Sequence, residues 1–583
     1  MRCVALVTVR IALAALAIAM LAWWLWHAES TVLWSHAVLV AVAAVAGLWQ
    51  RLRWRTSRNA VASDHHADRG SLAEQNASTA VFWVIAVALG MLSFNGHWLT
   101  GEDQRAWQPA IHDEFSYLFQ AKTFLAGRLW HPGHPTLPRL FDQIHVLNEG
   151  KFASRYFPGT GLWLAPFLAM GFPLAGQWLA GSLATMLVFG STLQITSLRA
   201  AVVAGLVMAV SPLVLLLGNF MTASQPTLLG MSLFLCAFLR MRRTGSAWFA
   251  ILAGFGLTFA MLCRPLTAAA LAFPFGLWCL AESIRDQSRR RLLIPLAAPV
   301  LCGLLALFLY NQQITGSGWI SPWQQYNSVY TPSHRYGFNN VTLDTGPRID
   351  RDYNDFADNL TPDLAFRNAR RRMVSSWTLI VGIVPLSLAA LVFATGLRRL
   401  DEASLALLSS AACLHLAYSF YWFAGVFQCH YVAEATGCWA ILFACAADAA
   451  SRRNGGGGAA LKILFLGTTM LGLAEAYGAY GTGGYRDASD GFRSFRNRHT
   501  AFADLVQQHT GTVRALVLVP EPPLNLHVDY VVNDPQLRNR VLFGRHYADL
   551  DEQQIAKEFP DRQVYVFDER RFEIHPLVND ERE

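Results

Sequence analysis

Apolar segments of membrane-spanning length recur from one end of this chain to the other. A helix needs roughly 17–25 apolar residues to cross a lipid bilayer, and about thirteen segments approach that length. They are residues 7–26, 33–50, 80–98, 177–196, 200–217, 222–239, 247–262, 265–281, 292–310, 376–397, 403–422, 430–449 and 460–477. Because 53% of the 583 residues are hydrophobic and only 15% are charged, a soluble protein is excluded. The predicted fold is an all-α polytopic membrane protein with about thirteen transmembrane helices.

Short arginine clusters lie between alternate segments and predict the topology. They are residues 51–58, 199, 240–243, 285–291, 398–399 and 452–453. Simple alternation of the segments puts all of these clusters on one side, and the positive-inside rule makes that side cytoplasmic. The N-terminus is then cytoplasmic. Loops 99–158 and 311–375, and the whole region after Tyr477, lie outside.

Two stretches do not fit simple alternation. Residues 161–176 are apolar, but a crossing there would reverse the topology, so we expect a juxtamembrane or re-entrant segment. The "RRR" cluster at 370–372 lies outside, next to a predicted span. It is interpreted either as a cluster that faces phosphate or lipid, or as part of a long loop that is translocated regardless of its charge.

The chain divides into three parts. Residues 1–79 form a two-helix membrane region with a cytoplasmic loop, and residues 80–477 form the main transmembrane domain. Residues 478–583 are polar, with short apolar runs at 515–519, 541–543 and 564–567 and a helical stretch between the last two, which predicts a small α/β domain outside the membrane. The net charge of +7 is dispersed in the arginine clusters, so nucleic acid is not an expected partner.

The stretch "IHDEFSYLFQ", residues 111–120, places Asp113 and Glu114 side by side just after the third span. Two interpretations stay open. The pair could cap a helix that begins there, since acidic residues stabilise the first turn. Alternatively the pair is functional, because ionisable groups beside a membrane are costly to desolvate. The same loop is rich in His, Tyr and Arg, which is more than a simple connector needs.

An ordered set of motifs resembles a known superfamily. The stretches "DEFSYLFQAKTFLAGRLWHPGHP", "QIHVL", "ASRYFPGTGLWLA", "CRPLTA" and "NQQITGSGWISPWQQYNSVYTP" are similar to the C-type, polyprenyl-phosphate-dependent membrane glycosyltransferases. The best-known members are protein O-mannosyltransferases and lipid A aminoarabinose transferases, and these motifs are more similar to a group of largely uncharacterised bacterial members. The resemblance covers roughly residues 80–450. Two positions depart from it: Ser116 stands where the aminoarabinose transferases have Arg, and "QCHYVAE" (428–434) stands where an Arg-Tyr-Tyr-x-Glu run is expected.

The resemblance implies an inverting transfer of sugar from a polyprenyl phosphate to an acceptor at the outer face of the membrane. It assigns Asp113 as general base and Glu114 as a group that positions the acceptor or a metal. Arg155 matches the basic residue that contacts the donor phosphate, although an arginine extending to lipid headgroups would look the same. Arg264 stands alone between two spans on the side with few basic residues, so it needs an anionic partner, either the donor phosphate or a loop carboxylate.

Further residues are predicted to bind substrate. Tyr117, His145, Tyr156, His430, Tyr431 and Glu434 are the remaining candidates. His430 and Glu434 are expected one turn apart on one helix face at the start of the twelfth span. Aromatic residues of the second outer loop could stack on sugars or anchor the loop; these are Trp323, Tyr326, Tyr330 and Tyr336.

No cofactor is implied with certainty. A divalent metal is possible but not indicated, because the spacing of His112, His131, His134 and His145 matches no metal-ligand pattern. The nine cysteines include no Cys-x-x-Cys pair and imply neither a disulfide framework nor a metal site.

The predicted function is therefore an integral membrane glycosyltransferase of the bacterial inner membrane, with a periplasmic C-terminal domain. Its expected partners are the lipid bilayer, a polyprenyl-phosphate sugar donor and an acceptor in the cell envelope, which could be a lipid, a glycan or a protein. Two alternatives stay open. A secondary transporter would carry ionisable groups within its spans, where this chain has very few. An inactive envelope scaffold of the same fold would keep the architecture without the chemistry.

Overall fold

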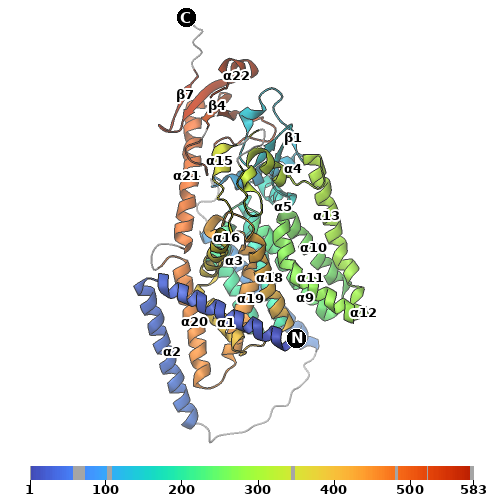
Figure 1. Ribbon diagram of the computed structural model, residues 1–583, viewed down its shortest axis with the longest axis vertical. Coiled ribbons are helices and arrows are strands. Elements are labelled where there is room, and N and C mark those ends of the chain that lie inside the picture. Colours follow the sequence, from blue (N-terminus) through green and yellow to red (C-terminus); the bar gives the residue numbers. More distant parts are fainter. Residues whose placement is uncertain are drawn as a thin grey trace.

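The computed structural model describes residues 2–56, 72–100, 108–342, 348, 350–479, 484–521 and 523–577. Most of these residues are helical, and the long helices form an elongated body with a small sheet-containing domain at one end (Figure 1). The helices of the body are α1 (Arg2–His27), α2 (Ser30–Thr56), α3 (Leu72–Thr100), α6 (Leu174–Ile195), α7 (Leu198–Val210), α8 (Pro212–Gly218), α9 (Ser224–Thr244), α10 (Ala247–Cys263), α11 (Pro265–Arg285), α12 (Gln287–Arg290), α13 (Leu293–Thr315), α17 (Ile383–Ala394), α18 (Glu402–Tyr418), α19 (Thr436–Ser451) and α20 (Gly456–Ala476).

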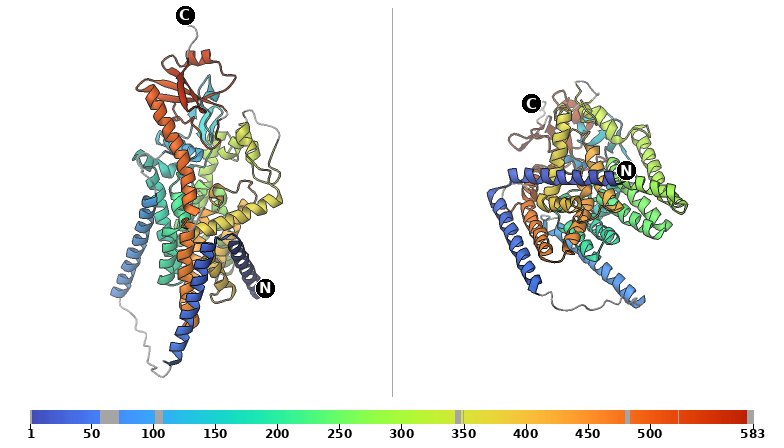
Figure 2. Two further views of the ribbon diagram at one scale, coloured as in Figure 1. Left: turned by 90° about the vertical axis from the view of Figure 1, so that its left-hand side faces the viewer. Right: turned by 60° about the horizontal axis from the view of Figure 1, so that its bottom comes forward.

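Every segment predicted to span the membrane is wholly or largely helical in the structure. By length and apolarity, 6 helices among the described residues qualify as membrane spans, or up to 8 if each bent pair counts as one. The chain is thus a multi-pass membrane protein, while the count of about thirteen spans stays a prediction. Helix α1 crosses the body obliquely, whereas α13 and α20 run along its length (Figures 1 and 2).

The predicted span at 376–397 is wrong as a single helix. Helix α16 (Pro362–Ile380) and α17 meet there at a bend of 101°. The 12 residues of α17 extend about 18 Å at 1.5 Å per residue, short of the ~30 Å hydrocarbon core. Gly382 sits at the corner with φ 97° and packs against Gly472 so closely that a built Cβ would lie 2.6 Å from the Gly472 Cα. Only glycine combines this positive φ with so close an approach of the two backbones.

The polar loops gather at one end of the body. The first loop contains α4 (His112–Leu125) and a three-stranded antiparallel sheet of β1 (His131–Pro132), β2 (Val146–Asn148) and β3 (Lys151–Ser154) in the order β1-β3-β2. The apolar stretch after it folds as α5 (Pro158–Ala169), a helix of 12 residues that is too short to cross. The second loop contributes α14 (Pro322–Tyr330), α15 (Arg351–Asp355) and α16.

The C-terminal domain has the predicted α/β character. It contains α21 (Gly484–Thr510), β4 (Ala515–Pro520), β5 (Val541–His546), α22 (Glu552–Glu558), β6 (Gln563–Asp568) and β7 (Glu573–Pro576). The sheet order is β5-β4-β6-β7, with β4 parallel to both neighbours and β7 antiparallel to β6. Helix α21 continues the direction of α20 away from the body and carries the sheet (Figure 1).

The first polar loop and the C-terminal domain share a core. Leu140 and Phe141, from the loop, pack with the β4 and β5 side chains Leu516, Leu518 and Leu542. The Asp529 carboxylate also accepts a hydrogen bond from the Ile144 backbone N–H at 2.8 Å. This contact fixes the residue beside His145, so the domain braces the loop that carries several predicted site residues.

Candidate active site

Most of the predicted site residues converge on one cavity of about 410 Å³ at the polar-loop end of the body. Its wall includes Asp113, Tyr117, Arg155, Tyr156, Arg264, His430 and Tyr431. Apolar side chains such as Leu217, Leu266 and Leu307 complete the wall. The cavity is therefore charged at one part of its surface and lipophilic at another. Glu114, His145 and Glu434 do not line it.

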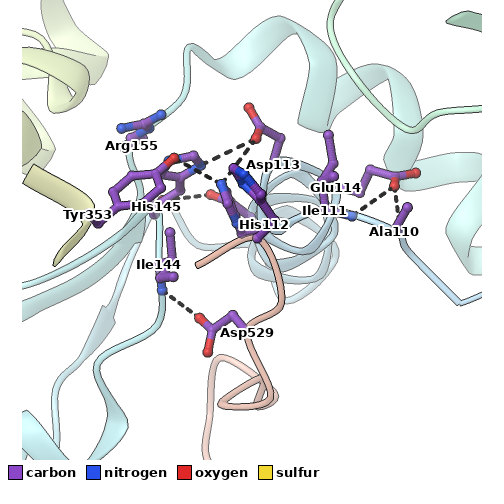
Figure 3. A network of polar contacts seen from close by, with 12 residues as sticks. Ala110, Ile111, His112, Asp113, Glu114, Ile144, His145, Arg155, Tyr353 and Asp529 are labelled. Carbon is purple, nitrogen blue, oxygen red and sulfur yellow. Dashed lines mark hydrogen bonds and ion pairs between the residues drawn. The ribbon is translucent and has the colours of Figure 1, made fainter. Parts of the chain in front are cut away.

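Asp113 lies in the first turn of α4 with its side chain 34% exposed toward this cavity. The Tyr156 hydroxyl donates a hydrogen bond of 2.5 Å to Asp113 Oδ1. His112 Nε2 and His145 Nδ1 lie 3.8 Å and 3.7 Å from Oδ2. Figure 3 shows both imidazoles beside the carboxylate. One carboxylate oxygen is thus held in place while the side chain stays accessible.

The two histidines beside Asp113 are neutral. Burial lowers the pKa of His112 to about 4 and outweighs the opposing effect of the Asp113 charge. Burial lowers the pKa of His145 well below its ordinary value, and the nearby charge of Arg155 acts in the same direction. A neutral imidazole donates through one nitrogen and accepts through the other.

Neutral histidines give the hydrogen bonds around Asp113 a single direction. A carboxylate only accepts, so Tyr156 donates to Asp113, and its oxygen accepts from His145 Nδ1 at 2.9 Å. His145 Nε2 then accepts from the Tyr353 hydroxyl at 3.1 Å. The Tyr353 oxygen in turn accepts from His112 Nε2 at 2.9 Å. The two tyrosines and His145 thereby orient the Asp113 carboxylate.

His145 is held in a backbone conformation that few non-glycine residues adopt. Its φ is 65°, which costs roughly 1–3 kcal/mol unless the surroundings enforce it. The Ser116 hydroxyl donates to the His145 carbonyl at 2.7 Å, and the Arg155 N–H donates to the same oxygen at 3.1 Å. The His145 N–H donates to the Tyr326 hydroxyl at 3.0 Å. Ser116, where the chain departs from the aminoarabinose transferases, is fully buried and positions His145.

Arg155 is a buried cation without a carboxylate partner among the described residues. It follows β3 and is 8% exposed. Its guanidinium lies 4.9 Å from the ring centre of Tyr326 and 5.2 Å from that of Tyr156. Its polar contacts, to Asn327 Oδ1 and Tyr156 Oη, are long at 3.5 and 3.4 Å, and its Nε has no hydrogen-bond partner in the described structure. A buried charge of this kind favours binding of an anion.

Arg264 lies at the junction of α10 and α11 and has a carboxylate partner. Its Nη1 donates to Glu434 Oε1 at 3.1 Å and to the His430 carbonyl at 3.0 Å. Glu434 itself is buried. Gly159, in the "FPGTG" motif, lets α5 approach this junction, because a built Cβ there would lie 2.7 Å from the Leu262 carbonyl carbon. Of the two anionic partners considered for Arg264, the structure shows the carboxylate of Glu434. Contact with a donor phosphate stays a prediction, and Arg264 lines the cavity.

The helical arrangement predicted for residues 430–434 is wrong. Helix α19 begins only at Thr436, after a short 3-10 turn over Ala433–Ala435. Phe427 and Gln428 adopt left-handed backbone conformations, with φ of 54° and 57°, which delay the start of the helix. His430 and Glu434 therefore meet at Arg264 through a backbone carbonyl and a carboxylate, not along one helix face. Tyr431 lines the cavity and stacks on Tyr418.

The Glu114 side chain points away from that of Asp113 (Figure 3) and does not line the cavity. It is 1% exposed, and its carboxylate accepts from the backbone N–H groups of Ala110 at 2.7 Å, Ile111 at 3.4 Å and Met221 at 3.0 Å. Burial raises its pKa, against the effects of the Arg496 charge and these N–H donors. The capping interpretation thus describes Glu114, and its predicted role toward acceptor or metal has no support from this geometry.

Arg372, the last residue of the "RRR" cluster, faces neither phosphate nor lipid. It is fully buried and donates to four backbone carbonyls. These belong to Tyr418, Tyr421, Phe423 and Ala424. Arg372 therefore holds the loop after α18, whose aromatic side chains form part of the cavity wall.

Solved structures include proteins similar to this chain, whereas no family model and no curated protein sequence matches it. One is ArnT, a lipid A aminoarabinose transferase from Cupriavidus metallidurans, with 13% identity over 85% of this chain and 94% of ArnT, and a TM-score of 0.49. The same protein bound to undecaprenyl phosphate gives a TM-score of 0.46. The oligosaccharyltransferase of Archaeoglobus fulgidus matches with 13% identity over 78% of this chain and 63% of its own, at a TM-score of 0.46.

Two site residues, Tyr353 and Asp529, carry no recognisable signal in the sequence. Tyr353, whose hydroxyl joins the two histidines, lies in a polar loop with no motif around it. The Asp529 carboxylate, from the C-terminal domain, accepts a hydrogen bond from the backbone beside His145.

The aromatic residues predicted in the second loop lie in two places in the structure. Trp323 and Tyr336 line the cavity, whereas Tyr326 and Tyr330 stack on each other behind it.

A metal ion could bind at His112, Asp113 and His145. Their ligand atoms lie within 4.8 Å of one another, so the argument from sequence spacing does not hold. However, His112 Nε2 and His145 Nδ1, the nitrogens nearest the carboxylate, already contact tyrosine hydroxyls at 2.9 Å. An ion at this position would have to displace those hydrogen bonds. Adding a chelator to the purified protein distinguishes a site that holds an ion from one that is organised by these hydrogen bonds.

Proposed function

We propose that this protein is an integral membrane glycosyltransferase that moves a sugar from a polyprenyl-phosphate donor to a cell-envelope acceptor, with inversion. The observation that carries the proposal is the shared cavity. Asp113 offers an accessible carboxylate, and Arg155 offers a buried guanidinium without a carboxylate partner among the described residues. A base and an unpaired cation on one wall are what transfer from a phosphate-linked donor requires.

The chemistry assigns a role to each group. Asp113 takes the proton of the acceptor hydroxyl or amine as that atom forms its bond to the anomeric carbon of the sugar. The bond from this carbon to the phosphate oxygen breaks, and its electron pair leaves with the phosphate. Arg155 stabilises the negative charge that develops on the phosphate, with Arg264 nearby on the same cavity. The apolar wall around Leu217, Leu266 and Leu307 suits the first isoprene units of the lipid.

The site lies at the end of the body where the polar loops gather. If the predicted topology holds, this end faces the periplasm and the reaction takes place at the outer leaflet.

The test is transfer of radiolabelled sugar from a set of synthetic polyprenyl-phosphate sugars by the purified protein in lipid nanodiscs, with envelope extract as acceptor. We expect label in the acceptor fraction with the native protein and little with Asp113→Asn. Movement of sugar across proteoliposomes without any transfer would favour a transporter. Tight donor binding without turnover for any donor would favour an inactive scaffold.

A further inference from the structure

A second cavity, of about 390 Å³, lies between the polar loops and the C-terminal domain. Its size is within the range of small-molecule pockets, about 300–1,000 Å³. Asp142, Gln143 and Asp350 line it from the loops, and Glu521 and Tyr547 line it from the domain. The predicted glycosyltransferase chemistry uses none of these residues.

The arginines of this cavity are neutralised by carboxylates. Arg348 forms an ion pair with Asp142, and Arg139 contacts Asp549 at 3.4 Å. Arg545 contacts Glu521 at 3.1 Å and Asp529 at 2.8 Å. Because these cations are already paired, the cavity has little attraction for a phosphate or another anion.

Three polar side chains of the cavity are left available to a ligand. Gln143 is 4% exposed, and neither its amide oxygen nor its amide nitrogen has a hydrogen-bond partner in the described part of the chain. A buried amide left unpaired costs about 1–3 kcal/mol. Asp350 and Asp352 also line the cavity and form no ion pair with any described residue. An amide that both donates and accepts, next to two acceptors, matches groups that do both, such as sugar hydroxyls.

Aromatic side chains form a rigid part of the cavity wall. Tyr326 and Tyr330 stack on each other, with ring centroids 4.7 Å apart, and both reach the cavity wall. Tyr547 lines it from the domain side. Both tyrosines of the stacked pair are buried, at 2% and 6% exposed, and Arg155 and Arg348 lie over their rings, so the pair forms a rigid wall of the cavity and not an open stacking surface.

This second cavity is coupled to the catalytic one by direct contacts. The Tyr326 hydroxyl accepts from the His145 N–H, and its ring faces the Arg155 guanidinium at 4.9 Å. The Asp350 carboxylate accepts from the backbone N–H of Tyr353, the residue that joins the two histidines. A ligand here therefore lies beside the reacting groups, across a wall of one or two side chains.

We propose that the second cavity binds a saccharide segment of the acceptor, so that the acceptor is a glycan or a glycolipid with a sugar headgroup. The assignment of this sugar to the acceptor rests on the proposed function, whereas the binding of a sugar in this cavity does not depend on it. A lysine-rich peptide would also be drawn to Asp350 and Asp352. The uncharged, unpaired Gln143 favours hydroxyl groups over ammonium groups.

The test measures binding without turnover. Saturation-transfer difference NMR is recorded on the full-length protein in detergent with cellobiose, chitobiose and mannobiose as probes, and with trilysine as a competitor. We expect saturation transfer to at least one disaccharide, and roughly tenfold weaker binding in Gln143→Leu, as the loss of one or two hydrogen bonds predicts. Asp352→Asn serves as a second, surface variant and should also weaken binding.

The control variants separate the possible outcomes. Gln143→Leu should melt at the same temperature as the native protein or higher, because the amide that it removes has no partner. Asp113→Asn should bind the disaccharide normally, so a failure of the proposed sugar transfer leaves this result intact. No signal with any disaccharide, an unchanged signal in Gln143→Leu, or displacement by trilysine alone would each overturn the saccharide site. A signal lost in Asp113→Asn but kept in Gln143→Leu would place the sugar in the catalytic cavity and overturn it too.

Discussion

Replacement of Arg155 by methionine tests the phosphate site most directly. Methionine keeps an unbranched apolar stem and removes the guanidinium with its charge. Among the described residues, the Arg155 side chain makes two polar contacts, both long, and its Nε has no partner, so its donors are available to a phosphate. Hydrogen bonds to a charged group contribute about 1.5–3 kcal/mol, which corresponds to a roughly 10- to 150-fold rise in the apparent KM for the donor.

The stability of this variant distinguishes a binding role from a structural one. Arg155→Met loses two cation–π contacts, worth roughly 0.5–2 kcal/mol each. It also removes a buried charge that lacks a carboxylate partner among the described residues, which is worth several kcal/mol in the opposite direction. We therefore expect an unchanged or higher melting temperature together with the raised KM. Arg155→Lys keeps the charge but not the planar guanidinium. Its donor KM should therefore lie between those of the native protein and Arg155→Met.

The assay is donor-dependent transfer in nanodiscs, paired with thermal unfolding of the same preparations. Arg372→Met is a comparison for stability, because Arg372 is also buried but its guanidinium is satisfied by backbone carbonyls. It should lower the melting temperature, which Arg155→Met should not do. A normally folded Arg155→Met protein with native KM, or one that behaves like Arg372→Met, would refute the phosphate assignment.

Four further predictions can be checked with the same preparations. Asp113→Asn should lower turnover about 10²–10⁴-fold and leave the melting temperature normal. Glu114→Gln should cost ~1–3 kcal/mol of stability and leave turnover per folded molecule intact. Equal effects of the two variants on turnover would contradict these separate roles. Arg264→Ala should destabilise by ~3–5 kcal/mol because buried Glu434 loses its partner, and adding Glu434→Gln should restore most of the melting temperature, so that any remaining rise in donor KM reports the phosphate contact. Treatment with EDTA should leave transfer unchanged, and activity that is lost and then restored by Mn²⁺ or Zn²⁺ would instead assign a metal to the carboxylate and its two histidines. Gln536→Cys, on the exposed surface of the C-terminal domain, should react with an impermeant maleimide in intact cells, and labelling only after lysis would reverse the topology.

The helices and the small sheet were predictable from local sequence. Apolar runs bounded by arginine clusters locate the helices of the body, and runs such as "ALVLV" locate the strands of the C-terminal sheet. The bend at Gly382 was not predictable, because the apolar composition continues across it. A packing contact with Gly472, remote in the sequence, decides the corner.

Only part of the site was predictable. Arg264 was found because a charged group between two spans needs an anionic partner, whereas Asp113 and Arg155 were assigned from the resemblance of the motifs around them. The hydrogen bonds that organise them could not be found this way, since Tyr353 is 241 residues from His112 in the sequence. Contacts of that range depend on how two loops fold against each other, which no local pattern records.

The pair Asp113-Glu114 shows why adjacent residues with the same chemistry acquire different roles. Successive residues on an α-helix point about 100° apart, at 3.6 residues per turn. When α4 turns Asp113 toward the cavity, Glu114 must face the packed side of the helix, where three backbone N–H groups receive it. An expectation that both carboxylates serve one reaction conflicts with this geometry. The helix start fixed by Glu114 is what aims Asp113, so the capping carboxylate and the proposed base are two parts of one local arrangement.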